Sequence, residues 1–197
     1  MKKLGILVSG RGSNMTAILD ACEKGNLSAS VEIVISNNPD AEALVIAKEK
    51  KINTICFDTS VSENPELLDK SICNVLNDYN VDLVLLAGYM NMVGPIILSM
   101  FGNKILNVHP SLLPKYGGHG MYGINVHRAV INAREEESGA TIHLVNSHYD
   151  KGKILAQKSV VVDKYDTPET LAKKVLEVEH VLYVETVYKI IEGKIVL

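Results

Sequence analysis

Short apolar runs alternate with stretches of helical periodicity through the first half of the chain. The runs of strand length cover residues 4–8, 31–35, 54–57, 83–86 and 105–108, and the helical stretches cover 14–24, 41–50, 66–79 and 94–100. Uninterrupted apolar strands separated by helices are typical of a parallel sheet that is covered on both faces. The sequence therefore predicts an α/β fold: an open, mostly parallel, twisted sheet of Rossmann-like type with helices on both faces.

The pattern changes after Pro114. A glycine-rich loop over residues 117–123 and a short helix over 125–132 are followed by two segments of alternating polarity, 140–146 and 154–162. Alternation of this kind is typical of half-buried antiparallel strands. We expect these two segments to extend the sheet as a hairpin-like C-terminal β extension.

The last element is predicted to be one long amphipathic helix. Thr167 is a good N-cap residue, and Pro168 occupies the first helical position, which suits proline. Apolar residues then recur at helical spacing, at positions 171, 175, 178 and 182. The helix is expected to pack back onto the sheet, and a chain of 197 residues with no visible linker fits a single domain over 1–197.

Composition excludes several classes of protein. The net charge of −3 and the pI near 6.1 lack the basic surplus of a nucleic-acid-binding protein. The three cysteines, Cys22, Cys56 and Cys73, form no CxxC pair, so we interpret them as reduced core residues of a cytosolic protein. No apolar run reaches membrane-spanning length, and the N-terminal run is too short for a signal peptide. We expect a cytoplasmic protein with small-molecule partners, without nucleic acid or membrane, and either monomeric or weakly dimeric.

The segment Asn107-Val108-His109-Pro110-Ser111-Leu112-Leu113-Pro114 carries the most chemical information. Residues i and i+2 of a strand project from the same face, so Asn107 and His109 should enter one pocket, walled by a loop that the two prolines stiffen. An amide and an imidazole together suit a reaction in which a carbonyl oxygen becomes negative while a leaving nitrogen takes up a proton.

The glycine loop after the first strand, Ser9-Gly10-Arg11-Gly12-Ser13-Asn14, leads into the first helix. Backbone N–H groups at such a helix start commonly bind a phosphate. A dinucleotide is disfavoured because Met15 replaces the third glycine of the fingerprint and Asn37 stands where an acidic residue is expected. A tight turn without ligand explains the glycines equally well, so the loop alone leaves both interpretations open.

Several motifs together resemble the phosphoribosylglycinamide formyltransferase family, the folate-dependent formyltransferases of purine synthesis. They are Gly12-Ser13-Asn14, Ala87-Gly88-Tyr89-Met90, the stretch from Asn107 to Tyr116, Ser138-Gly139-Ala140-Thr141-Ile142-His143, Asp150 with Gly152, and Glu179-His180. The resemblance implies the formyltransferase fold, with residues 1–100 as a phosphate-binding half and 101–197 as a catalytic and folate-binding half.

For the substrates, the resemblance implies two adjoining sites. Gly12, Ser13 and Asn14 would bind the phosphate of glycinamide ribonucleotide, and Glu179 would contact its ribose or glycinamide portion. The co-substrate 10-formyltetrahydrofolate would lie against residues of the second site, which are Met90, Asn91, Met92, Val93 and Asn107.

For the chemistry, the resemblance implies Asn107, His109 and Asp150 as the catalytic set, with no metal. Asn107 and a protonated His109 would stabilise the oxyanion of a tetrahedral intermediate, and His109 would protonate N10 of the folate. Asp150 would hold His109 in its cationic form. We expect the other histidines, at positions 119, 127, 143, 148 and 180, to be solvent-facing or structural, and 135–137 to be a solvated turn.

The chain departs from the family pattern on the folate side. Lys153 replaces the usual proline and, with Lys151, is expected to perturb the charge of Asp150. Asn91 replaces a common arginine, and residues 59–66 contain no basic side chain, so Lys115, Arg128 or another group would replace them in binding the glutamate tail. The four glycines of 117–123 make mobility of that loop plausible. Competing hypotheses are hydrolysis of formyltetrahydrofolate, an amino-sugar nucleotide as acceptor, and a phosphosugar-binding module without catalysis.

Overall fold

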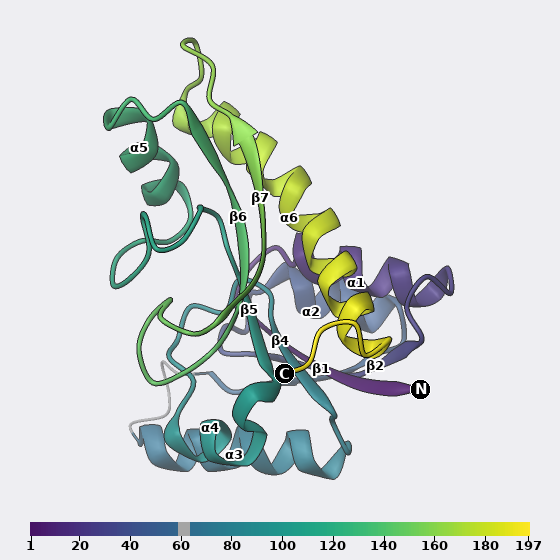
Figure 1. The fold of residues 1–197 in the computed structure, drawn as a ribbon. Coiled ribbons are helices and arrows are strands. Elements are labelled where there is room, and N and C mark those ends of the chain that lie inside the picture. The colour runs from purple at the N-terminus through teal and green to yellow at the C-terminus, as the bar shows by residue number, and fades with distance from the viewer. Residues whose placement is uncertain (59–63) are drawn as a thin grey trace.

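A mixed sheet organises the chain, as seen in a computed structural model that describes residues 1–58 and 64–197 (Figure 1). The order of the strands across the sheet is β3-β2-β1-β4-β5-β6-β7. Their bounds are β1 Lys2–Val8, β2 Ala29–Ser36, β3 Asn53–Cys56, β4 Leu83–Leu86, β5 Ile105–His109, β6 Glu137–Leu144 and β7 Ile154–Val161. Strands β1 to β5 are parallel, and β6 and β7 are antiparallel additions, which confirms the predicted fold class.

Helices cover the two faces of the sheet. They are α1 Ser13–Glu23, α2 Glu42–Glu49, α3 Pro65–Asp78, α4 Pro95–Phe101 with the short 3-10 turn η1 Gly102–Lys104, α5 Ile124–Asn132 and α6 Pro168–Ile191. Apolar residues of α1, α2 and α6 form one core on the first face, and those of α3 and α4 form a second core on the opposite face (Figure 1). Each face of the parallel strands is therefore buried, as their uninterrupted apolar character predicts.

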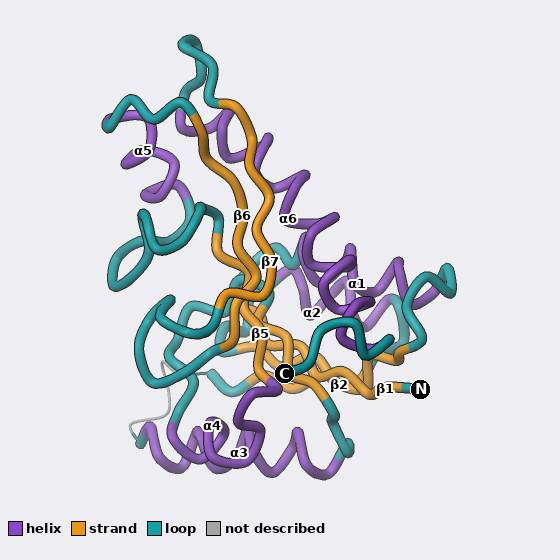
Figure 2. Tube along the Cα trace, viewed as in Figure 1, coloured by secondary structure: helices purple, strands orange, loops and turns teal. Residues whose placement is uncertain are grey.

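The C-terminal part follows the predicted plan. Strands β6 and β7 run out from the parallel part of the sheet with α6 beside them (Figure 2). Thr167 caps α6 by accepting a hydrogen bond from the backbone N–H of Thr170, and Pro168 is the first helical residue, as predicted. The buried Tyr183 of α6 donates its hydroxyl hydrogen toward the carbonyls of Leu86 and Leu106, at 3.1 and 3.2 Å. Helix α6 is thus fixed over the ends of β4 and β5.

Two local predictions were wrong. Cys56 lies exposed at the end of the edge strand β3 rather than in the core, and Cys22 is half-buried, so only Cys73 of the three is fully buried. Residues 135–137 are not a simple solvated turn: Glu137 begins β6, and Glu135 accepts hydrogen bonds from Lys115 and Tyr116. In both cases the position of other segments in the fold decided the environment: an edge position for Cys56, and the loop that carries Lys115 and Tyr116 for Glu135.

Strand order determines where a ligand can bind. Strands β2 and β4 lie on opposite sides of β1, so the connections that leave β1 and β4 diverge at the carboxyl ends of these strands. In open α/β sheets, such a switch point leaves a crevice outside the strand ends. The loop after β1, the loop after β4 and the loop after β5 all start at this edge, which brings three of the sequence motifs together.

Candidate active site

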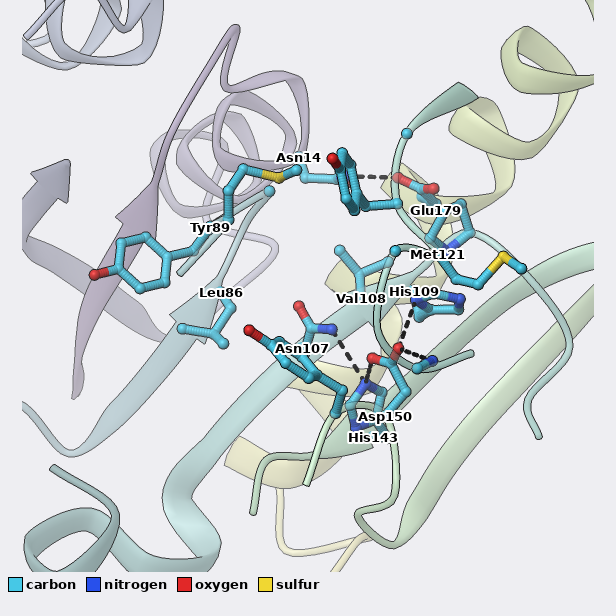
Figure 3. Close-up of a pocket in the computed structure, with 18 of the residues that line it drawn as sticks. Asn14, Leu86, Tyr89, Asn107, Val108, His109, Met121, His143, Asp150 and Glu179 are labelled. Carbon is cyan, nitrogen blue, oxygen red and sulfur yellow. Dashed lines mark hydrogen bonds and ion pairs between the residues drawn. The ribbon is translucent and has the colours of Figure 1, made fainter. Parts of the chain in front are cut away.

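A cavity of about 800 Å³ opens at this edge of the sheet (Figure 3). Its walls come from the loops after β1, β4 and β5, from residues 118–124 and 145–150, and from one side of α6. Asn107, His109 and Asp150 all line it, and so do Asn14 and Glu179. The structure therefore brings the predicted catalytic residues and two of the predicted substrate-binding residues into one space.

The geometry around His109 defines its tautomer. Its Nε2 lies 2.8 Å from the carbonyl oxygen of Tyr116, and a carbonyl can only accept, so Nε2 carries a hydrogen. Nδ1 faces Asp150 Oδ2 at 3.6 Å. Nδ1 is thus the nitrogen that gains and loses a proton, and the Tyr116 carbonyl fixes the plane of the ring.

The expectation that His109 is held in its cationic form was wrong for this structure. His109 is 4% exposed, and its burial lowers the pKa of the imidazole below its ordinary value. The Asp150 carboxylate and the Tyr116 carbonyl act in the opposite direction, but they offset the burial only in part. The neutral ring is therefore the resting form near neutral pH.

Asp150 is ionised in the same cluster. Burial acts to raise the pKa of its carboxyl group, but the neighbouring imidazoles of His143 and His109 and the N–H of Gly118 together lower it below its ordinary value. The Gly118 N–H donates to Oδ2 at 2.8 Å. Lys151 and Lys153 are exposed and have no part in this shift, so the expectation that they perturb Asp150 was wrong.

A glycine fixes the position of the Asp150 turn. Asp150 itself has a φ of 55°, in the left-handed region that aspartate tolerates better than most residues. A Cβ atom on Gly152 would lie 1.6 Å from the carbonyl oxygen of Leu144, so no other residue fits there without moving the backbone. The Asp-x-Gly motif therefore holds the carboxylate against the end of β6.

His143, which sequence reasoning placed among the solvent-facing or structural histidines, is a member of this cluster. It is 2% exposed, its Nε2 lies 3.1 Å from Asn107 Nδ2, and the same nitrogen lies 3.5 Å from Asp150 Oδ1 (Figure 3). The position of His143 could have been predicted only from the register of the strands, because Asn107 and His143 are direct partners in the antiparallel β5–β6 pair.

The four remaining histidines differ in exposure, and His180 on α6 is half-buried. His119 and His148 are exposed at the rim of the cavity, as expected. His127 is instead buried in its wall, where burial first and the neighbouring His109 second lower its pKa to about 4. His127 is therefore neutral at physiological pH.

The β1–α1 loop reaches the other end of the cavity. Gly12 has a φ of +78° and is packed so closely against Ala43 that a side chain would not fit. Helix α1 starts at Ser13, and Asn14 Nδ2 donates a 2.6 Å hydrogen bond to Glu179 Oε2 on α6 (Figure 3). Asn14 Oδ1 is buried and has no hydrogen-bond partner within residues 1–58 and 64–197. Of the predicted phosphate-binding residues, Asn14 lines the cavity and Gly12 and Ser13 do not, whereas Arg11 of the same loop does.

Glu179 is 8% exposed, and this burial raises the pKa of its carboxyl group to about 7, with the Asn14 hydrogen bond acting in the opposite direction. The folded state binds the proton on the Glu179 carboxyl group more tightly than the unfolded chain does. Protonated Glu179 therefore stabilises the folded state fully below the ordinary pKa of 4.5, and this stabilisation is lost as the pH rises through about 7. This loss amounts to about 3 kcal/mol in the free energy of unfolding.

We expect Glu179→Gln to flatten this pH dependence, because glutamine still accepts from Asn14 but never ionises. Urea unfolding followed between about pH 5 and pH 8 should show a decline for the parent chain and little decline for the variant. Glu177→Gln, an exposed neighbour on α6, is the matched control. An equal decline in all three proteins would show that Glu179 does not titrate in this range.

The residues expected at the folate site form a third wall. Met90, Asn91, Met92 and Val93 all line the cavity, with Met90 and Met92 about half exposed and Val93 buried. The backbone N–H of Met90 donates to Ser9 Oγ at 2.8 Å, which ties this loop to the end of β1. Exposed methionine side chains suit a flat aromatic ligand, because they are polarisable and adaptable.

Neither basic residue proposed for the folate tail lines the cavity. Lys115 is paired with Glu135 at 2.9 Å, and Arg128 donates to Asn125 Oδ1 at 3.1 Å. Among the described residues, the lysine and arginine side chains that do line it are Arg11 and Lys173. Part of the segment 59–66, residues 59–63, lies outside the described residues.

Residues 1–58 and 64–197 lack two features that would point to other kinds of protein. No helix in these ranges has the length and apolarity needed to cross a membrane. The same residues contain no group of three or more His, Cys, Asp or Glu side chains arranged to hold a metal ion.

Comparison with known proteins gives a consistent result. The family model for formyl transferase matches residues 2–187. The chain is 44% identical over 195 residues to the chloroplastic phosphoribosylglycinamide formyltransferase of Arabidopsis thaliana, covering 98% of this chain and 67% of that protein. It is 38% identical over 195 residues to phosphoribosylglycinamide formyltransferase of Haemophilus influenzae, covering 99% of this chain and 90% of that protein. The chain thus spans only about two thirds of the plant relatives' length.

Similarity extends to the fold. The crystal structure of glycinamide ribonucleotide transformylase 1 from Symbiobacterium toebii superimposes with a TM-score of 0.94 at 36% identity, over 100% of this chain and 91% of that one. The order and direction of the strands described above are thus those of a solved structure.

Proposed function

We propose, on the premise that this chain belongs to the phosphoribosylglycinamide formyltransferase family, that Asn107, His109 and Asp150 carry out formyl transfer between two substrates bound side by side in the cavity. The activity is transfer of a formyl group to phosphoribosylglycinamide in purine biosynthesis, with a formyl folate as co-substrate. The observation that carries the assignment is that the three residues share one cavity with Asn14 and Glu179.

The acceptor would occupy the end of the cavity at α1. The N-terminal N–H groups of α1, at Gly12, Ser13 and Asn14, suit a phosphate, because a helix start of this kind favours an anion. Asn14 Oδ1 is a buried acceptor without a partner among the described residues, and the buried Glu179 accepts from Asn14, so both suit the hydroxyl or amine hydrogens of glycinamide ribonucleotide.

The donor would occupy the wall formed by Met90, Asn91, Met92 and Val93, with 10-formyltetrahydrofolate as the proposed form. Asn107 then lies between donor and acceptor, since its carboxamide borders the same cavity (Figure 3). Both halves of the chain contribute to both substrate sites, so we propose that residues 1–197 act as one functional unit.

The reaction transfers one formyl group and one proton. The acceptor amine forms a bond to the formyl carbon, and the formyl oxygen becomes negative; the Asn107 N–H groups suit that oxyanion. As the bond from carbon to N10 breaks, the proton that leaves the amine must reach N10. A neutral His109 can take this proton at Nδ1, directly or through Asp150 and a water, and deliver it to N10. The lowered pKa of His109 suits such a relay, because the ring starts unprotonated.

One assay separates the competing functions. Consumption of a 10-formylfolate donor should be followed by absorbance with glycinamide ribonucleotide, with water alone and with an amino-sugar nucleotide. We expect turnover only with glycinamide ribonucleotide. Rapid turnover in water alone would identify a hydrolase, and no turnover with any acceptor, together with tight phosphosugar binding, would support the non-catalytic module.

Removal of the Asn14 side chain should weaken acceptor binding selectively. We expect Asn14→Ala to raise KM for glycinamide ribonucleotide about tenfold, because one or two buried hydrogen bonds are lost. Asn91→Ala is the matched control on the opposite wall, and it should change KM for the donor instead. Steady-state kinetics with each substrate varied in turn measures both effects. If the KM for glycinamide ribonucleotide were unchanged in Asn14→Ala, the acceptor would not bind at this end of the cavity.

A further inference from the structure

His143 occupies a place next to the reacting groups that the proposed mechanism does not use. It lies on β6, directly opposite Asn107 on β5, and both side chains project from the same face of the sheet. Its imidazole is buried and borders the cavity beside Asn107 and Asp150 (Figure 3). Its Nε2 lies within 3.1 Å of Asn107 and 3.5 Å of Asp150, which points to a role that acts through these neighbours.

Hydrogen-bond geometry assigns the two nitrogens of this ring different roles. His143 Nδ1 lies 2.8 Å from the carbonyl oxygen of Leu144, which can only accept, so Nδ1 carries a hydrogen. In the neutral ring Nε2 then has a free lone pair. That lone pair faces Asn107 Nδ2 at 3.1 Å and accepts one of its two N–H groups.

We propose that His143 is a positioning residue that sets the orientation of the Asn107 carboxamide. This inference rests on the formyl-transfer function proposed above and adds a residue to it. A carboxamide can turn by 180° about its last bond at little cost when nothing distinguishes its nitrogen from its oxygen. The His143 lone pair makes that distinction: it holds the Asn107 nitrogen toward the side where His109 and Asp150 lie (Figure 3).

The orientation matters because of the charge that develops. With its nitrogen toward His109 and Asp150, Asn107 presents an N–H where the formyl oxygen becomes negative. With the amide reversed, its oxygen would repel that charge. Asp150 Oδ1, 3.5 Å from the same His143 nitrogen, is the other group facing the ring, so a role through Asp150 must be tested separately.

Two variants separate the hydrogen bond from the space that the ring fills. In His143→Gln, the side-chain oxygen can take the place of Nε2 as acceptor, whereas His143→Leu keeps comparable bulk without any acceptor. We expect kcat to fall about 30- to 100-fold in His143→Leu, somewhat less than for outright loss of an oxyanion donor. His143→Gln should stay within about fivefold of the parent, and KM for both substrates should change little in either variant. Equal kcat losses in both variants, or losses confined to KM, would overturn the proposal.

Double-mutant cycles identify the neighbour through which His143 acts. In an Asn107→Ala background, His143→Leu should cost less than about a further twofold in kcat, because the group that it positions is already gone. In an Asp150→Asn background, it should keep most of its effect. The reverse pattern would show that His143 acts on Asp150 instead.

One readout does not depend on activity and separates this inference from the function on which it rests. In ¹⁵N-labelled protein, a coupling across the hydrogen bond should link Asn107 Nδ2 with His143 Nε2, and the His143 ¹⁵N shifts should report hydrogen on Nδ1. Absence of that coupling in a folded, active enzyme would overturn the positioning role. Its presence in a protein without formyl transfer would count against the proposed function and leave the geometry intact.

Discussion

Replacement of His109 by glutamine should lower kcat by about a thousandfold, within the range typical for loss of a general acid–base group. The ring has two separate tasks in this structure: Nε2 donates to the Tyr116 carbonyl at 2.8 Å, and Nδ1 faces Asp150. The glutamine amide can keep the first hydrogen bond, but it cannot take up or release a proton. His109→Gln therefore removes the proton relay without releasing the loop at Tyr116.

His109→Ala provides the comparison, because it removes both tasks. We expect its kcat to be no higher than that of His109→Gln, and we expect an additional loss of thermal stability because the Tyr116 carbonyl loses its donor. Single-turnover kinetics with saturating substrates measures the chemical step directly. If His109→Gln retained more than a tenth of the parental rate, His109 would be an anchor for the loop rather than the proton carrier.

Asp150→Asn should reduce kcat by about two to three orders of magnitude, with little change in either KM. The carboxylate accepts the Gly118 N–H at 2.8 Å and lies 3.6 and 3.5 Å from the nearest nitrogens of His109 and His143. Asparagine has the same shape and can still accept from Gly118, so the loop should remain in place. The variant lacks the negative charge that favours a proton on His109 and the oxygen that can receive the amine proton.

The pH dependence of the rate provides a second measurement on Asp150→Asn. Because Asp150 acts to raise the pKa of His109, its neutralisation should move the His109 titration in the pH–rate profile to lower pH. Asp163→Asn is the matched control, since Asp163 is exposed and pairs with Lys174, and neither residue lines the cavity. Parental kcat and an unshifted profile in Asp150→Asn would exclude Asp150 from the proton pathway.

Most of the fold could be predicted because each of its strands and helices is specified by residues that are close together in the sequence. Each strand of the parallel core is an apolar run bounded by turn residues, so β4 was predicted with its observed bounds and the other parallel strands to within a few residues. Helix α6 was equally clear from Thr167, Pro168 and the apolar spacing that follows. The exposure of Cys56 was predicted wrongly because it depends on the position of β3 at the edge of the sheet. The order of the strands cannot be inferred from the residues of a single segment.

The site was predictable only where its residues share a motif. Asn107 and His109 belong to one strand, so a common pocket follows from the two-residue repeat. His143 was missed because its proximity to Asn107 depends on the register of a strand 36 positions away. The charge state of His109 was also mispredicted, because a sequence shows the neighbouring Asp150 but not the depth of burial that outweighs it.

The hydrogen bond between Asn14 and Glu179 joins residues 165 positions apart. A ribosome makes the glycine loop 165 positions before Glu179, so the acceptor end of the cavity stays open while the residues between them are added. Closing so long a stretch of chain is also among the slower events in folding. A nascent or truncated chain that ends before Pro168 would carry the whole Asn107–His109 motif yet lack one wall of the cavity. Formyl transfer should therefore begin only after α6 has docked against the rest of the cavity.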